Sequence, residues 1–417
     1  MKTWIIEPHD SFIARDGRPF GLIAGVRAAS LPFPFPSTTT GGVRTRAGLD
    51  AAGVFDAAKI SEVKTFHVHG ALLVELDDHG TVVRWFAHAP ADALLLDADD
   101  RDTDKAKVCR LVPGELPDNA ATNLPDGLMP LYLQSKDKPH GYAPRFWNWA
   151  AFEKWLFDPK NFKVKSLYDF GIRELPQDER SHVGIERDSQ TSEQGHLFQT
   201  RGLEFTRRKQ RFEDGSTQLD KAARLALAVS TDATNIETGV ASLGGERRLI
   251  TWRDFQGEEN ILDSQCPDAI VKAIVEDKAC RVVVLTPAYF AQGWKPRWMT
   301  DDKAGIQGDL TVSLKAAAIS RAQVVSGWDF EFVGKNDEGK VIRGRPKPTR
   351  RLVPAGAVFF LKFSGNEAGL KARIEEWIKA TWMRCVSDDD EKWKMTPRRD
   401  GFGLAVLGRW PEGKEAN

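Results

Sequence analysis

The feature that most constrains this chain is the stretch from Phe12 to Arg46, which follows on from an apolar segment at residues 4–13. That segment predicts a first strand, and the Asp16-Gly17 pair after it predicts a turn. A connector rich in proline and phenylalanine then stops at Ser37. Serine is a favoured N-cap residue, so we expect a helix that begins at Ser37 and ends near Ala52.

The start of this expected helix has the chemistry of an anion site. Backbone N–H groups and the helix dipole attract negative charge there, and hydroxyl side chains such as that of Thr38 stand beside them. Arg44 and Arg46 follow further along the helix. The arrangement suits a phosphate group, although the same spacing also fits a plain connector and a capped helix with two solvated arginines.

Apolar periodicity predicts strands and helices in the order β, α, β, β, α, β through each half of the chain, which is the ferredoxin-like pattern. We therefore expect an α+β chain of two fused ferredoxin-like domains, residues 1–215 and 216–417, with a surface insertion at about residues 97–145. The predicted strands are 66–76, 81–88, 224–230, 280–286, 310–318, 324–332 and 357–363, and the further helices are 146–157, 269–276 and 370–382.

Residues 181–205 predict a hairpin of two short strands around a polar tip that is longer than a tight turn needs. Such a hairpin is either a loop without fixed structure or an arm that reaches a partner. Of the eight histidines, His182 at the hairpin start is the best candidate for acid–base cleavage, although a lone histidine there also fits a structural role.

The 417 residues carry 59 basic and 59 acidic side chains, so the formal net charge is zero. A freestanding nucleic-acid binder is usually basic, which counts against one here but not against a subunit of a larger assembly. Residues 340–351 hold six basic residues and no acid. Four scattered cysteines fit reduced thiols, and no apolar run is long enough to cross a membrane. We expect a cytoplasmic protein without a metal or cofactor.

Motifs for nucleotide chemistry are weak, whereas loops that suit a phosphate chain recur. Residues 334–341 approach a P-loop, but Val341 stands where serine or threonine would hold magnesium. Two glycine turns, Gly244-Gly245 and Gly401-Phe402-Gly403, would let backbone come close to a phosphate. Nearby cations are Arg247, Arg248, Lys347, Arg350 and Arg351. The sequence does not place these loops on one face.

Taken together, these residues resemble one family. The segments that carry the resemblance are residues 12–20, the run into Ser37-Thr38, residues 182–185 with 195–198, residues 243–246, and residues 347–356. They are similar to the third subunit of the type III-B CRISPR Cmr complex, a member of the RAMP superfamily, over residues 4–410. Gly401-Phe402-Gly403 is similar to the glycine-rich loop of that superfamily, whereas Thr39-Thr40-Gly41-Gly42 departs from the usual helix-favouring pattern.

The resemblance implies two ferredoxin-like, RRM-like RAMP domains and no catalytic site. It implies that the chain holds the 5′ tag of the CRISPR RNA beside the large polymerase-like subunit and the backbone subunits, and that its hairpin presses into the duplex of guide and target RNA in antiviral defence. This implied role agrees with the phosphate-suited loops and cations found above, since such groups hold single-stranded RNA by its backbone. The candidate RNA-binding residues are Arg15, Arg18, Ser37, Thr38, Arg44, Arg46, His182, Arg187, Gly244, Gly245, Arg247, Arg248, Lys347, Arg350, Arg351, Gly401 and Gly403.

Two alternatives stay open. The first is a RAMP-type endoribonuclease that processes precursor CRISPR RNA, with His182 as general acid or base. The sequence offers no obvious histidine, tyrosine or lysine partner for it. The second is a protein scaffold that makes no contact with RNA.

Overall fold

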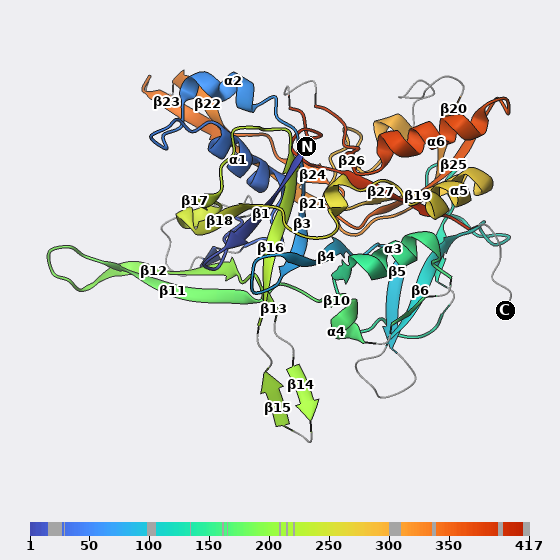
Figure 1. Ribbon diagram of the computed structural model, residues 1–417, viewed down its shortest axis with the longest axis horizontal. Helices are drawn as coiled ribbons and strands as arrows, with labels where there is room; N and C mark the ends of the chain where they lie inside the picture. The colour runs from blue at the N-terminus through green and yellow to red at the C-terminus, as the bar shows by residue number, and fades with distance from the viewer. Residues whose placement is uncertain are drawn as a thin grey trace.

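The computed structural model describes residues 1–15, 27–28, 30–97, 106–133, 135–160, 162–164, 166–207, 210–213, 216–219, 222–299, 310–335, 339–390 and 395–411. Within them, two antiparallel sheets form the body of the chain, and hairpins project from it (Figure 1). The expected Asp16-Gly17 turn and Arg18 lie outside the described residues.

The first sheet has nine strands in the order β10-β8-β4-β3-β16-β1-β18-β17, with β13 paired to β16. Both of its faces are buried: Trp4 and Ile6 of β1 join the core on one face, whereas Ile5 joins the core on the other. The bounds are β1 (Lys2–Pro8), β3 (Val68–Leu76), β4 (Val82–His88), β8 (Phe146–Asn148), β10 (Gly171–Ile172), β13 (Thr206–Arg207), β16 (Ala223–Thr231), β17 (Gly239–Ser242) and β18 (Leu249–Asp254).

The second sheet has the order β20-β25-β19-β27-β26, and two helices, α5 and α6, pack on it. Apolar residues recur at helical spacing along α6, and the buried ones include Ile374 and Ile378. The bounds are α5 (Asp268–Asp277), β19 (Ala279–Val284), β20 (Leu310–Ala318), β25 (Val358–Gly365), α6 (Leu370–Thr381), β26 (Arg384–Cys385) and β27 (Leu404–Arg409).

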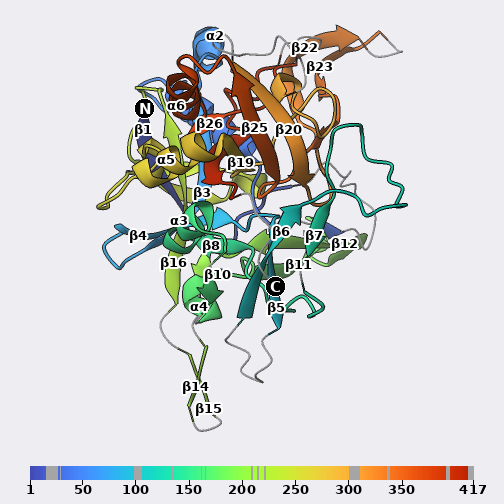
Figure 2. The same cartoon turned by 90° about the vertical axis from the view of Figure 1, so that its right-hand side faces the viewer.

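Smaller elements surround the two sheets (Figure 2). Short helices are α1 (Pro36–Ala47), α2 (Ile60–Val63), α3 (Trp149–Phe157) and α4 (Leu167–Phe170), with 3-10 turns at Ala57–Lys59, Gly245–Arg247, Ile261–Asp263 and Arg297–Met299. A small sheet contains β5 (Ala93–Asp97), β6 (Ala106–Pro113), β7 (Leu131–Leu133) and β9 (Lys163–Val164). The hairpins are β11 (Gln177–Ile185) with β12 (Ser192–Leu203), β14 (Gln210–Glu213) with β15 (Ser216–Leu219), and β22 (Trp328–Lys335) with β23 (Val341–Pro346). Strand β2 (Arg27–Ala28) pairs in parallel with β12, and β21 (Gln323–Val325) pairs with β24 (Arg350–Leu352) on either side of the β22–β23 hairpin in the chain.

The two halves of the chain share one hydrophobic core. Trp147 and Trp155, at the β8–α3 corner, belong to the same buried cluster as Val282 and Phe359 of the second sheet. A fully buried ion pair crosses the same boundary, because Arg281 of β19 contacts Asp92 from the segment between β4 and β5. The halves are therefore fixed to each other rather than joined by a free linker.

Several predicted elements are confirmed, and three predictions need correction. The hairpins over residues 66–88 and 181–205 and the strand at residues 310–318 are present. The boundary expected at residue 215 is wrong in its placement, because β16, β17 and β18 pair within the first sheet. The expected insertion at residues 97–145 holds β6 and β7, and the expected strand 324–332 is split between β21 and β22.

The helix after the aromatic connector also differs from expectation. It spans Pro36–Ala47, its N-cap is Phe35, and Ser37 does not cap it. Proline is well suited to the first helical position, since its missing N–H would have no partner there. The helix ends at Ala47, earlier than residue 52, and Gly48 is its C-cap. Gly48 packs on the ring of Phe55, which leaves no room for a side chain at this position.

Candidate functional site

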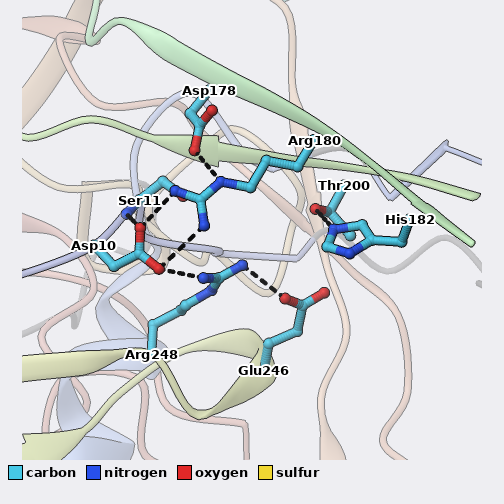
Figure 3. A network of polar contacts seen from close by, with 8 residues as sticks. All are labelled: Asp10, Ser11, Asp178, Arg180, His182, Thr200, Glu246 and Arg248. Carbon is cyan, nitrogen blue, oxygen red and sulfur yellow. Dashed lines mark hydrogen bonds and ion pairs between the residues drawn. The ribbon is translucent and has the colours of Figure 1, made fainter.

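The base of the β11–β12 hairpin is held by a network of charges around Asp10, just beyond the end of β1 (Figure 3). Oδ1 of Asp10 lies 2.7 Å from Nη2 of Arg180, and its other oxygen contacts Arg248. Arg180 also donates to Asp178 at 2.6 Å, and Arg248 donates to Glu246 at 2.9 Å. The hydrogen bond from Arg180 lowers the pKa of Asp10 to about 2, so this carboxylate is ionised at neutral pH.

The Gly244-Gly245 turn lies next to this charge network, because Glu246 follows it directly, and the turn packs on Ile13. The N–H of Gly245 donates to the carbonyl of Ile13 at 2.7 Å. Gly244 has φ of 78°, and a Cβ there would lie 2.6 Å from that carbonyl oxygen. The glycines are thus required by the close packing of this turn on Ile13, and the N–H of Gly245 is taken by protein rather than left for a phosphate.

The hairpin itself has two different faces. The ring of His182 stacks on that of Phe198, with centroids 5.0 Å apart, and His182 is hydrogen-bonded to Thr200. The cross-strand pair Val183 and Leu197 is exposed instead, as is Ile185, whose side chain is 61% exposed. One face of the projecting strands therefore presents aliphatic side chains to solvent.

The predicted anion site at the start of α1 is built differently from expectation. Ser37 and Thr38 are half-buried, and the N–H of Thr38 donates to the carbonyl of Phe35. Arg44 pairs with Asp400 at 2.8 Å and donates to the carbonyl of Val63.

Arg46 likewise donates hydrogen bonds to backbone carbonyls of the same chain. Its Nε donates to the carbonyl of Glu237 at 2.9 Å, and its Nη2 donates to that of Thr238 at 3.1 Å. Both arginines of α1 therefore hold neighbouring loops in place.

The Gly401-Phe402-Gly403 turn is buried, which contradicts the expectation that it offers its backbone to a phosphate chain. Both glycines have positive φ, 86° and 78°. A Cβ on Gly401 would lie 2.8 Å from two carbonyls of β3, and one on Gly403 would lie 2.7 Å from Oγ of Ser387. This turn joins the two halves of the chain, because Gly401 lies against β3 of the first sheet while Phe402 and Gly403 lead into β27.

The remaining predicted cations fall into two classes. The guanidinium of Arg350 lies over the rings of Tyr289 and Phe402, and burial lowers its pKa. The side chains of four others are exposed: Arg187, Arg247, Lys347 and Arg351. Among the described residues, these four side chains make no ion pair or hydrogen bond. Arg15 is exposed as well and forms an isolated backbone bridge with Ser30.

A cavity of about 130 Å³ lies beside the aromatic connector. Phe33 of the connector, His88 of β4 and Phe146 of β8 form an aromatic wall, in which the His88 and Phe146 rings are 4.7 Å apart. Burial lowers the pKa of His88 to about 4, so its ring is neutral at pH 7. Arg145 lines the cavity and is exposed. Neutral aromatic rings beside a cation suit a stacked base and its phosphate.

The structure thus gathers the predicted residues into two groups. His182, Gly244, Gly245 and Arg248 belong to or adjoin the hairpin base, whereas Ser37, Thr38, Arg44, Gly401, Gly403 and Arg350 surround the start of α1 and the 396–403 loop. Sequence reasoning missed Asp10 and Arg180. The available signal was the opposite charge of Asp178 and Arg180, which lie two residues apart and therefore share one face of the strand.

The described part of the chain contains no group of three or more histidine, cysteine or carboxylate side chains that could hold a metal ion. None of its helices is both long enough and apolar enough to span a membrane.

Comparison with known proteins gives one family. No curated protein matches the sequence. Two solved chains are similar to it at 12% identity, each comparison covering 86% of both chains. Their descriptions are "Cryo-EM structure of the Type III-B Cmr-beta bound to cognate target RNA and AMPPnP, state 1", with a TM-score of 0.41, and "Cryo-EM structure of the Type III-B Cmr-beta bound to cognate target RNA", with a TM-score of 0.42. The family model described as "CRISPR-associated protein (Cas_Cmr3)" matches residues 4–410, nearly the whole sequence. The chain therefore belongs to the CRISPR-associated Cmr3 family, the third subunit of the type III-B Cmr complex.

Proposed function

We propose that this chain is a non-catalytic subunit that binds CRISPR RNA in a type III-B effector complex. In this proposal it holds the 5′ tag of the guide beside the large polymerase-like subunit and the backbone subunits, and its β11–β12 hairpin inserts at the duplex of guide and target. The observation that carries the proposal is the projecting hairpin with Val183, Ile185 and Leu197 exposed (Figure 1). Aliphatic wedges of this kind unstack adjacent base pairs in other nucleic-acid complexes.

The strand order supports the RAMP part of the proposal. In the first sheet β18-β1-β16-β3 are neighbours, with α1 between β1 and β3 in the chain. In the second sheet the neighbours are β27-β19-β25-β20, with α6 between β25 and β27. Each set has the fourth-first-third-second order of a ferredoxin-like sheet with one of its two helices. Between β16 and β18 the chain forms β17 and a 3-10 turn where the second helix of the first set would stand.

The cavity at the aromatic connector is the best place for a base of the tag. Its walls are the rings of Phe33, His88 and Phe146, and ring stacking on bases is tolerant of sequence. Among the residues that line the cavity, Arg145 is an exposed cation for the phosphate, and Glu174 is an exposed carboxylate. Arg44 and Arg248 are weaker candidates than the sequence indicated, because carboxylates of the same chain already pair with them.

A hairpin variant tests the inserted wedge. In the assembled complex, Val183→Ser with Leu197→Ser removes the aliphatic pair without adding charge. Val240→Ser with Leu249→Ser changes two exposed aliphatic residues of the β17–β18 edge and serves as the control. We expect both variants to retain guide RNA. If the wild-type hairpin opens a base pair of the guide–target duplex, chemical probing should show that this pair closes in the hairpin variant and stays open in the control. An unchanged probing pattern in that variant contradicts the proposal.

The endoribonuclease alternative has its own test. His182 stacks on Phe198 and bonds to Thr200, and no second acid–base group contacts its ring among the described residues. We expect labelled repeat RNA to stay intact when incubated with the purified chain without metal. If the chain cleaved the repeat RNA specifically and His182→Ala abolished that cleavage, the chain would be an endoribonuclease and the non-catalytic proposal would be wrong.

A further inference from the structure

The cavity beside the aromatic connector has polar groups on its lining that ring stacking does not use. It lies where the two halves of the chain meet: His88 and Phe146 belong to the first sheet, whereas Pro287, Gln323 and Ala355 come from the second half. Junctions between packed units are common places for small ligands. The polar groups on the lining therefore bear on which base the cavity accepts.

Glu174 is a carboxylate on this lining that has no partner of its own. The backbone around it is fixed, because the carbonyl of Ile172 accepts from the N–H of Arg145 at 3.0 Å and Leu175 is 1% exposed. The Glu174 side chain makes no ion pair or hydrogen bond among the described residues, not even with Arg145, which lines the same cavity. Both of its oxygens can therefore accept hydrogen bonds from a ligand.

Gln323 of β21 adds a second acceptor. Its backbone is held by the pairing of Gln323 with Leu352 of β24. Its Oε1 is buried and has no hydrogen-bond partner in the described part of the chain. Rotation about the last side-chain bond turns either end of the amide toward the cavity. Since buried polar atoms are nearly always paired, an unpaired acceptor on a cavity wall calls for a donor from the occupant of that cavity.

The four bases differ in what they present to such a wall. The Watson–Crick edge of guanine carries two adjacent donors, N1–H and N2–H, and one carboxylate can accept both. The same edge of adenine or cytosine sets an amino donor beside a ring nitrogen that accepts. Uracil sets its N–H between two carbonyl oxygens. A carboxylate that faces any of these three meets a lone pair, so an acceptor-rich wall favours guanine.

We propose that this cavity selects a guanine base, which stacks on the aromatic wall while Glu174 accepts from its N1–H and N2–H. The remaining hydrogen of N2 is accepted by Oε1 of Gln323. Arg145 stays available for the phosphate, so one nucleotide is held by its ring face, its edge and its charge. The proposal rests on the proposed function only in taking this base from the guide RNA, because a free guanine nucleotide offers the same edge.

Equilibrium binding of short RNA oligomers to the purified full chain tests the selection. The oligomers are uridine throughout except for one central nucleotide, which is guanosine, inosine, adenosine or cytidine, and an all-uridine oligomer is the reference. We expect the guanosine oligomer to bind about tenfold or more tightly than those with the other natural bases, as for a bidentate contact to a base edge. Inosine lacks the N2 amino group and should fall between guanosine and adenosine. Equal affinity for all the oligomers overturns the inference.

Glu174→Gln separates recognition of the base from the general effect of charge. If Glu174 only repelled phosphates, its neutralisation would strengthen binding of every oligomer by the same factor. We expect instead that the preference for guanosine disappears, because an amide offers one acceptor where the carboxylate offers two. Glu375→Gln changes an exposed carboxylate of α6 and is the matched control, which should keep the preference. A guanosine preference that survives in Glu174→Gln overturns the inference.

Guanosine monophosphate distinguishes the two sources of the base and separates this inference from the proposed function. Tighter binding of the guanosine oligomer than of the mononucleotide would support RNA as the source. If the mononucleotide bound in a way that required Glu174 while no oligomer bound, the guanine assignment would stand and the proposed function would be refuted. If the oligomers bound without regard to base, the proposed function would stand and this inference would fail. Binding of neither the oligomers nor the mononucleotide also overturns the inference.

Discussion

The buried ion pair between Asp92 and Arg281 should make a large contribution to stability, and its removal is the sharpest test of how the two halves are joined. Their side chains are 1% and 2% exposed, and Oδ2 of Asp92 lies 2.5 Å from Nη1 of Arg281. The remaining donors of Arg281 reach the carbonyls of Arg409 and Trp155, both at 2.7 Å. Nε1 of Trp155 donates to the other oxygen of Asp92 at 3.2 Å. Every polar group here has a partner.

Asp92→Ala leaves the guanidinium buried without its counter-charge. Breaking a buried pair from one side costs about 3–5 kcal/mol. At about 2.1 cal/mol/K of unfolding entropy per residue, a chain of 417 residues has about 0.9 kcal/mol/K, so the melting temperature should fall by about 3–6 °C. Asp92→Asn keeps the shape and should still be destabilising, because the charge of Arg281 stays unpaired.

Thermal unfolding followed by circular dichroism measures this, with Asp254→Ala as the matched control. Asp254 pairs with Lys2 at 2.7 Å, but both side chains are about half exposed. Surface pairs contribute only about 0–1 kcal/mol. Equal melting temperatures for Asp92→Ala and Asp254→Ala would refute the claim that the buried pair joins the halves.

Three further predictions concern local features. His69 and His88 have pKa values lowered to about 4 by burial, below their unfolded value of 6.5, so the unfolded chain binds more protons and the free energy of unfolding should fall as pH drops from about 6.5 to 4. A denaturant titration at each pH measures the free energy of unfolding. If that free energy depended on pH no more in the wild type than in the double variant His69→Gln with His88→Phe, the prediction would be wrong. Gly403→Ala should lower the melting temperature far more than Gly53→Ala, because both have positive φ but only Gly403 meets other atoms within 4 Å. Asp10→Asn should speed amide hydrogen exchange at the base of the hairpin while leaving β25 unchanged, and equal exchange in both proteins would show that the network does not hold the hairpin.

The elements that could be predicted from the sequence are those whose signal lies within one short stretch of residues. The alternation in residues 66–88 and 181–205 fixes two hairpins, and the spacing of Leu370, Ile374 and Ile378 fixes α6. The boundary near residue 215 could not be found in this way. Strand β16 pairs with β1 and β3 across more than 140 residues of sequence, and no local signal reports which sheet a strand joins.

The candidate site was predictable in residue type but not in role. Arg44 and Arg248 were identified as cations near phosphate-suited turns, yet each meets a carboxylate distant in sequence, Asp400 and Asp10 respectively. The glycines at 401 and 403 were expected to let the backbone come close to a phosphate chain, but atoms of the chain itself approach them instead. The approaching atoms are those of β3 and Ser387, which only the tertiary structure brings there.

The most direct test of RNA binding is ultraviolet crosslinking of the assembled complex to its guide and target RNA, followed by mass spectrometry of the crosslinked peptides. We expect crosslinks from the 5′ tag to the aromatic connector at residues 31–38 and from the duplex to the hairpin at residues 181–205. Crosslinks confined to other subunits, with none on this chain, would make it a protein scaffold and contradict the proposed function.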